Sequence, residues 1–159
     1  MITDSLQPFI KNKLEQLQKQ NINVSDLELD HFGYQTASKE DYDTKTKDVN
    51  TIAIMKSENI VGRRRVGIYK LNNPYIYENY TVLGFELVEP REGQVCSSQL
   101  DHLEFVLNCS FDDYIAINTA VNWDTTTMTR PEFAKLTVKF DDGTSIKFHL
   151  KNIFEEIPN

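Results

Sequence analysis

The sequence predicts an α+β protein in which one N-terminal helix precedes two similar modules. Three observations predict this class. Apolar residues recur at helical spacing over 5–21, the dipeptide Asp-His at 30–31 recurs at 101–102, and each Asp-His is followed by a helical segment and then by strands. A chain of 159 residues can form one compact domain, or two small modules that share a core.

The segment 5–21 is predicted to be an amphipathic helix that packs against the modules. Its apolar side chains fall on one face, and Lys and Gln lie opposite. Pro8 is tolerated there because it lies in the first turn. The residues of the apolar face are Leu6, Phe9, Ile10, Leu14 and Leu17.

The first module is predicted to span residues 25–92, after an N-terminal segment 1–24. Ser38 is a suitable N-cap for its helix because Glu40 and Asp41 follow in the first turn. The tripeptide Asn72-Asn73-Pro74 predicts a turn. The expected order is a strand at 29–36, a helix after Ser38, and strands near 52–54, at 61–71 and at 81–88.

The second module, residues 93–159, is predicted to repeat this order. Ser110 is expected to cap its helix, and Asp141-Asp142-Gly143 predicts a hairpin between two strands. Residues 122–130 form a polar loop that holds at most a short edge strand. The expected elements are strands at 100–107, 134–140 and 144–150, with a last helical turn at 153–157.

The internal repeat selects four candidate metal ligands. His31 and His102 occupy matching points of it, and the strand 83–87 resembles 146–150, which matches Glu86 with His149. In each strand the candidate lies opposite an apolar face, because alternate residues of a strand point to opposite sides. We therefore expect these four side chains to lie together on the face that the helices do not cover.

Imidazole and carboxylate groups at one point indicate a site for one divalent ion, namely Zn, Ni, Fe, Mn or Co. Such a donor set leaves coordination positions open, as a catalytic ion requires. Asp30 and Asp101 should alternate away from the histidines, so we expect them neither to bind the metal nor to support its ligands. The alternative is that these histidines are merely solvated on an open sheet face.

Composition and charge restrict the partners. The net charge of −7 argues against a nucleic-acid surface, and Arg63-Arg64-Arg65 is too small a basic cluster for one. No apolar run is long enough to span a bilayer, and no secretory signal is recognisable, so a cytoplasmic protein with free Cys96 and Cys109 is expected. Two modules in one chain can complete the site, so a monomer or weak dimer is expected.

Several short motifs, in this order, resemble the YecM-like group of the vicinal oxygen chelate superfamily, which also contains glyoxalases, bleomycin-resistance proteins and extradiol dioxygenases. The resemblance covers nearly the whole chain. It consists of Asp-His in both first strands, Gly62-Arg63-Arg64, Ile68-Tyr69-Lys70-Leu71, Phe85-Glu86-Leu87, Ile146-Lys147-Phe148-His149 and Glu155-Glu156-Ile157.

The resemblance implies paired βαβββ modules that form an open, incomplete barrel around a metal. It carries over the same ligands, His31, Glu86, His102 and His149. Superfamily members include isomerases, lyases, dioxygenases and drug-binding resistance proteins. The second module departs from the pattern, because the stretch 121–135 is short enough for one strand to be reduced or missing.

The leading functional hypothesis is a metal-dependent enzyme of isomerase, lyase or dioxygenase type that acts on a small, oxygen-bearing substrate. Glu104, two residues after His102, is the candidate general base, and Arg64 is the candidate for binding an anionic substrate. Two alternatives remain. One is a non-catalytic module that sequesters a small molecule in the same cavity, and the other is an interaction protein in which the cavity is vestigial.

Overall fold

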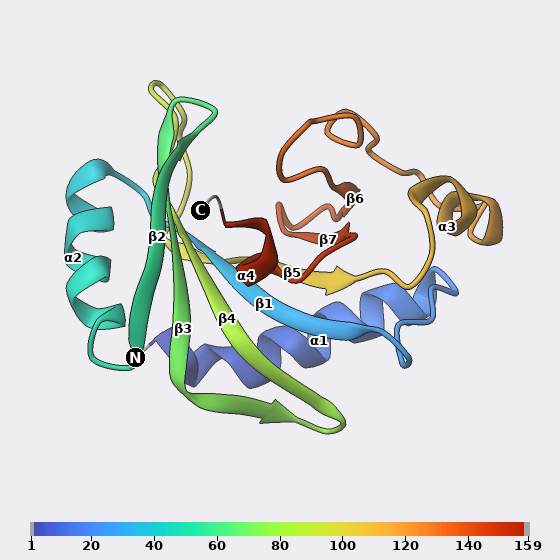
Figure 1. Cartoon of the computed structure of the whole chain (residues 1–159), viewed down its shortest axis with the longest axis horizontal. Helices are drawn as coiled ribbons and strands as arrows, with labels where there is room; N and C mark the ends of the chain where they lie inside the picture. The colour runs from blue at the N-terminus through green and yellow to red at the C-terminus, as the bar shows by residue number, and fades with distance from the viewer. Residues whose placement is uncertain (1, 158–159) are drawn as a thin grey trace.

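The computed structural model describes residues 2–157 and shows a curved, seven-stranded mixed sheet (Figure 1). The strand order is β2-β3-β4-β1-β5-β7-β6. The elements are η1 (Ile2–Ser5), α1 (Leu6–Lys19), β1 (Glu28–Gln35), α2 (Lys39–Val49), β2 (Ala53–Val61), β3 (Arg64–Tyr77), β4 (Tyr80–Val88), β5 (Gln99–Val106), α3 (Phe111–Ile117), β6 (Leu136–Lys139), β7 (Ser145–His149) and α4 (Ile153–Glu156).

The two modules meet along β1 and β5, which are antiparallel to each other. Each of these strands pairs on its other side with the last strand of its own module, β1 with β4 and β5 with β7, and both pairs are parallel. The sheet does not close into a barrel. The α+β class and the open architecture of two modules with an N-terminal helix are confirmed.

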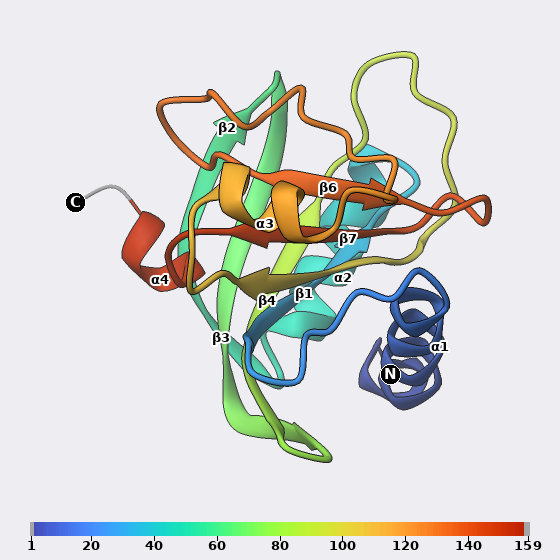
Figure 2. The same ribbon diagram turned by 90° about the vertical axis from the view of Figure 1, so that its right-hand side faces the viewer.

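The second module has one strand fewer than the first within the described residues. Where an edge strand would pair with β6, only an isolated bridge joins Asp124 to Thr137. The expectation of a reduced strand after residue 121 is confirmed. Its consequence is that the segment between α3 and β6 is an irregular arch, which Figure 2 shows above β6.

The apolar core lies between the outer face of the sheet and the first three helices, whereas α4 lies between the two halves of the sheet on its concave side (Figures 1 and 2). The core side chains of the strands are mainly aromatic or leucine, and they are at most 1% exposed: Leu29, Phe32, Tyr69, Phe85, Leu103, Phe105 and Phe148. Among residues 2–157, no helix is long and apolar enough to cross a membrane.

Both predicted helix caps are confirmed. The hydroxyl of Ser38 accepts a hydrogen bond from the Asp41 amide, and that of Ser110 accepts one from the Asp113 amide. Each cap satisfies a backbone N–H of the first turn that has no partner inside the helix. In each module the cap defines where the helix begins after the first strand. This matching position supports the predicted repeat.

The predicted turn at Asn72-Asn73-Pro74 is wrong, because these residues lie inside β3. The β3–β4 ladder is interrupted between Lys70 and Tyr75, so the strand bends there and continues. An irregular stretch tolerates proline because the missing N–H is not needed in the ladder. The turn lies further on, at Glu78, whose φ is +49°.

The strand ladders correct one pairing of the internal repeat. In the first module Gly33 lies beside Glu86, and in the second Glu104 lies beside Lys147. Since Gly33 and Glu104 each follow the Asp-His histidine by two residues, the counterpart of Glu86 is Lys147, and not His149 as predicted. His149 lies two residues further along β7, so alternation still places it on the face predicted for it.

Helix α1 is fastened to the second module by a buried lysine. The Lys13 side chain is 1% exposed, and its Nζ lies 2.8 Å from Asp142 Oδ2 in the β6–β7 hairpin. The other Asp142 oxygen accepts hydrogen bonds from the backbone and hydroxyl of Thr144. Burial opposes ionisation, but the Lys13 and Thr144 hydrogen bonds outweigh it and lower the pKa of Asp142.

We expect Asp142→Asn to destabilise the protein by about 1–3 kcal/mol, because it leaves a buried ammonium without its counter-charge while keeping the turn acceptor. Lys13→Met removes the charge itself and should cost less. Because the folded-state pKa is lowered, the contribution is complete above the unfolded pKa and is lost as pH falls below it. Urea unfolding at neutral and acidic pH measures the change in unfolding free energy. An equal loss of stability in Asp142→Asn and Lys13→Met would contradict this prediction.

Candidate metal centre

Buried polar side chains gather on the concave face of the sheet, where α4 also lies. Every one of them is at most 6% exposed, although all can carry charge. Groups of this kind are normally exposed unless they are paired or bind a metal. They come from β1, β4, β5 and β7 and are Asp30, His31, Glu86, His102, Glu104 and His149.

His31, Glu86 and His102 form one potential metal-binding group, in which one ligand atom from each lies within 4.8 Å of the others. His102 Nε2 is 3.4 Å from Glu86 Oε1, and His31 Nε2 is 3.8 Å from Glu86 Oε2. Bonds of roughly 2.1 Å to one ion place neighbouring ligand atoms about 3.0–3.4 Å apart. The first distance lies in this range and the second is slightly longer, so the structure brings three predicted ligands close to the geometry of a shared ion.

An aspartate orients each of these two histidines. His31 Nδ1 donates to Asp30 Oδ1 at 3.2 Å, and His102 Nδ1 donates to Asp101 Oδ2 at 3.0 Å. A carboxylate can only accept, so Nδ1 of each ring is protonated, and Nε2 is the nitrogen that would bind a metal. Both Nε2 atoms are buried without a hydrogen-bond partner in the described chain. In each ring, the aspartate thus directs Nε2 toward Glu86.

The prediction that these aspartates point away from the histidines is wrong, and the reason is a pair of β-bulges. In the β1–β5 ladder, Asp30 is the extra residue between Leu29 and His31, and Asp101 is the extra residue between Leu100 and His102. A bulge sets two consecutive residues against one, so strict alternation fails there. The repeated Asp-His is thus a repeated bulge that holds a carboxylate against its own histidine.

Glu104 lies against the same group. Its Oε2 is 2.8 Å from His31 Nε2 but without hydrogen-bond geometry, and its Oε1 is 3.2 Å from Lys135 Nζ. Burial opposes ionisation of Glu104, but Lys135, His149 and His31 outweigh it and lower its pKa. The carboxylate is therefore charged and has unused acceptor capacity beside the group.

His149, the fourth predicted ligand, falls into a second potential group with Asp30 and His31. Its Nε2 donates to Asp30 Oδ1 at 3.0 Å, while its Nδ1 lies 3.3 Å from Glu156 Oε1 of α4. Asp30 Oδ2 also accepts from the Ile153 amide at 2.8 Å. Asp30 is therefore a buried junction between β1, β7 and α4.

Carboxylates raise the pKa of two of the histidine rings, His31 and His149. Burial disfavours the protonated form of His31, but Asp30 and Glu104 outweigh it and raise its pKa to about 9. Burial also opposes protonation of His149, yet Glu104 and Asp30 raise its pKa to about 10. Without another cation, these rings hold protons that offset the surrounding carboxylates. A divalent ion would supply that positive charge instead.

Gly33 is needed because the His102 ring lies directly over its Cα, so a Cβ there would overlap the ring. We expect Gly33→Ala to displace His102, to weaken metal binding by about 10- to 100-fold and to destabilise the fold by about 1–3 kcal/mol. Titration with a metal indicator and urea unfolding measure both effects. In a Gly33→Ala/His102→Ala double variant the stability should return and metal binding should not; unchanged binding in Gly33→Ala would oppose this geometry.

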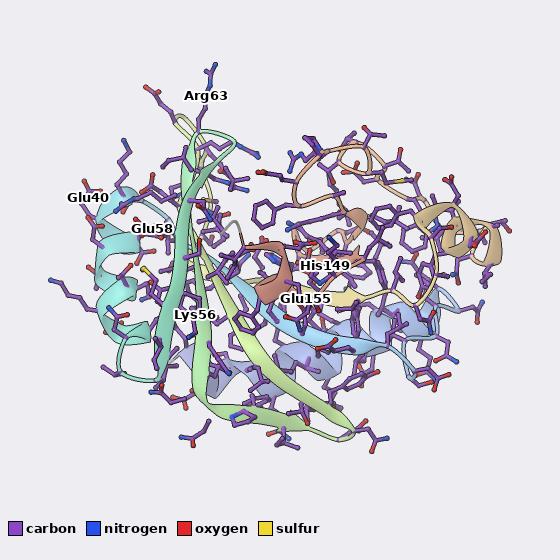
Figure 3. The ribbon with its side chains drawn as sticks, in the orientation of Figure 1. Glu40, Lys56, Glu58, Arg63, His149 and Glu155 are labelled. Carbon is purple, nitrogen blue, oxygen red and sulfur yellow. The ribbon has the colours of Figure 1, made fainter. Side chains whose placement is uncertain are left out.

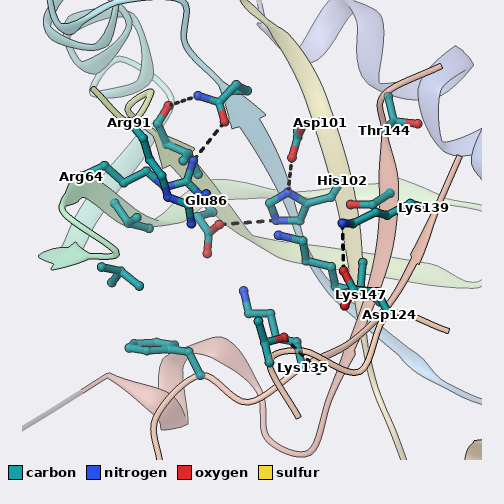
Figure 4. Close-up of a pocket in the computed structure, with 18 of the residues that line it drawn as sticks. Arg64, Glu86, Arg91, Asp101, His102, Asp124, Lys135, Lys139, Thr144 and Lys147 are labelled. Carbon is teal, nitrogen blue, oxygen red and sulfur yellow. Dashed lines mark hydrogen bonds and ion pairs between the residues drawn. The ribbon is translucent and has the colours of Figure 1, made fainter. Parts of the chain in front are cut away.

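A cavity of about 570 Å³ opens beside the group, and Figure 4 shows that Glu86, His102 and Arg64 line it. Arg64 is partly buried, and its guanidinium donates to Gln35 Oε1 at 3.4 Å. Its neighbour Arg63 points away from the molecule at the tip of the β2–β3 hairpin (Figure 3). The structure thus brings Arg64, the candidate anion-binding residue, to the cavity.

Sequence reasoning assigned no role to six further charged residues that line this cavity: Arg91, Asp124, Arg130, Lys135, Lys139 and Lys147. Lys147 was visible as the alternate residue before His149 on a predicted strand. Arg91 and Lys135 lie outside the strands, in segments without regular structure, where no periodicity indicates the direction of a side chain.

A family model for YecM protein matches residues 1–155. The chain belongs to the YecM family. A comparison with curated protein sequences finds no match. Among solved structures, a structural-genomics protein named EC4020 is similar over 97% of this chain and 88% of its own, with 22% identity and a TM-score of 0.79.

Two methylmalonyl-CoA epimerases also share the fold. The Streptomyces coelicolor enzyme, in complex with 2-nitronate-propionyl-CoA, is 14% identical over 82% of this chain and 98% of its own, with a TM-score of 0.56. The Mycobacterium tuberculosis enzyme is 13% identical over 76% and 85%, with a TM-score of 0.51. At these identities the likeness concerns the fold alone.

Proposed function

We propose that this YecM-family protein binds one divalent metal ion through His31, Glu86 and His102, and that the site acts on a small, oxygen-bearing substrate. The observation that carries the proposal is the convergence of two partnerless Nε2 atoms and one carboxylate within 4.8 Å. Two histidines and one carboxylate leave several coordination positions open for substrate oxygens. Zn, Ni, Fe, Mn and Co all suit this donor set.

The bound ion would supply Lewis acidity, which polarises a carbonyl or hydroxyl oxygen of the substrate. Glu104 would be the general base, because its carboxylate is charged, buried and adjacent to His31. Lys135, 3.2 Å from Glu104, holds that carboxylate in place and keeps it ionised. Arg64 would orient an anionic part of the substrate in the cavity.

We assign His149 a positioning role in place of the predicted direct ligation. Its Nε2 is engaged by Asp30, and its Nδ1 faces Glu156 and Glu104 at 3.3 and 3.7 Å. The ring therefore links the two carboxylates that contact His31. Loss of His149 should loosen Asp30 and Glu104 while leaving the three ligands in place.

A charged base beside open metal positions favours an enzyme over the alternative, a module that only sequesters its ligand. A sequestering cavity would be lined by apolar and aromatic side chains, whereas this one is lined mainly by charged and polar residues. Of the isomerase, lyase and dioxygenase types, proton transfer by Glu104 supports the first two. Solved neighbours that are named epimerases agree with an isomerase.

Deuterium exchange tests this proposal without knowledge of the product. Metal-loaded protein is incubated in D2O with 2-hydroxy acids, 2-oxo acids and malonyl-type thioesters, and exchange at the carbon beside the carbonyl is followed by NMR. We expect exchange with at least one class, lost when the metal is removed. Metal-dependent binding without exchange in any class would overturn the enzymatic proposal in favour of sequestration.

A further inference from the structure

The cavity beside the metal group is strongly basic, although the chain as a whole carries a net charge of −7. Only three carboxylates line it, namely Glu86, Asp101 and Asp124. Twice as many basic residues do so, drawn from β3, β6, β7 and the segments before β5 and β6: Arg64, Arg91, Arg130, Lys135, Lys139 and Lys147.

Most of this positive charge has no internal partner. Lys135 pairs with Glu104 and Lys139 with Asp124, at 3.2 and 2.9 Å. No carboxylate of residues 2–157 lies within 4.0 Å of the cationic groups of the other four. The lining carboxylates are already engaged, since Glu86 belongs to the metal group, Asp101 contacts His102 and Asp124 contacts Lys139.

Arg64 and Arg91 lie near each other in the cavity, as Figure 4 shows. Arg64 Nε is buried and has no hydrogen-bond partner in the described chain. Burial and then the neighbouring Arg91 charge lower the pKa of Arg64. Two guanidinium forks placed in this way match the oxygens of a phosphate or carboxylate group.

Lys147 and Lys135 face the same cavity (Figure 4). Lys147 occupies the place that the repeat matches with Glu86, so the second module presents a cation where the first presents a carboxylate. A bound divalent ion would add to this charge. Basic side chains thus outnumber carboxylates in the cavity lining, which favours a ligand with more than one negative charge.

We propose that the substrate is a small molecule with two anionic groups. Its chelating, carboxylate-bearing end lies at the metal group, and its second anionic group, a phosphate or a carboxylate, is bound by Arg64 and Arg91. The binding of the chelating end rests on the proposed function, whereas the anion site at Arg64 and Arg91 does not. The cavity volume of about 570 Å³ suits a molecule of this size.

Calorimetric titration of metal-loaded protein with matched probes tests the proposal. Lactate and glycerate offer a chelating 2-hydroxy acid alone, malate adds a second carboxylate, and 3-phosphoglycerate adds a phosphate. We expect malate or 3-phosphoglycerate to bind at least about tenfold more tightly than its parent, and the better of the two identifies the second group. Arg91→Gln and Arg64→Gln should each remove this advantage, measured as the ratio of the two affinities within the same variant.

Arg63→Gln is the matched control, because Arg63 adjoins Arg64 but lies outside the cavity and should keep the full advantage. The proposal is overturned if malate and 3-phosphoglycerate bind no more tightly than their parents, or if their advantage survives in Arg64→Gln/Arg91→Gln. Inorganic phosphate separates this failure from that of the proposed function. If lactate affinity does not depend on the metal, while phosphate affinity is still lost in the Arg64 and Arg91 variants, the anion site is supported and metal chelation is refuted.

Discussion

His102→Ala is expected to lower the affinity for a divalent metal by more than about 1,000-fold, so that the purified variant retains almost none. The variant removes one of three ligands and leaves Glu86 without the ring that lies 3.4 Å from it. Changes to groups that merely support a ligand typically cost about 10- to 100-fold, so direct loss should exceed that range. Metal analysis by mass spectrometry and a competition titration measure the effect.

His149→Gln is the informative comparison, because sequence analysis predicts it to be a ligand and the geometry assigns it a positioning role. We expect this variant to keep its metal with affinity reduced by about 10- to 100-fold. Melting curves with and without metal check that both variants fold. A His102→Ala variant that still binds one ion tightly, or a His149→Gln variant as empty as His102→Ala, would refute this assignment.

Glu104→Gln is expected to reduce turnover by about 100- to 10,000-fold in the deuterium-exchange assay, which is the usual contribution of a general base. Glutamine keeps the size of the side chain and can still accept from Lys135, but it cannot take a proton from substrate. The bound metal should remain, because Glu104 lies outside the group of His31, Glu86 and His102.

Glu155→Gln is a suitable control for that experiment. Glu155 is exposed on α4, next to Glu156, and its loss should leave exchange unchanged. Substrate affinity in Glu104→Gln should change far less than turnover. Normal exchange in Glu104→Gln, with metal bound, would mean that another group is the base.

Much of the fold was predictable because local patterns and tertiary structure agree. The apolar face of α1, the serine caps and the Asp-Asp-Gly hairpin each specify an element independently of their surroundings. Alternation within strands was enough to place His31, Glu86 and His102 on one face, because the strand segments next to these residues pair in regular register. The sequence therefore predicted all three residues of this potential metal-binding group.

The parts that could not be predicted depend on pairing between strands. A bulge is a property of two strands in register, so no single strand reveals that Asp30 and Asp101 turn back onto the histidines. Matching by sequence equated Glu86 with His149, whereas the ladders equate it with Lys147. The basic cavity likewise draws on distant segments, and its charge is hidden by the acidic composition of the whole chain.

The most direct test is a crystal structure of protein purified without chelators, with anomalous diffraction recorded at the absorption edge of the metal found in the sample. We predict one strong anomalous peak within bonding distance of His31 Nε2, His102 Nε2 and a Glu86 carboxylate oxygen. A peak bound by Asp30 and His149 instead, or no peak among these side chains in metal-replete crystals, would contradict the metal centre described above.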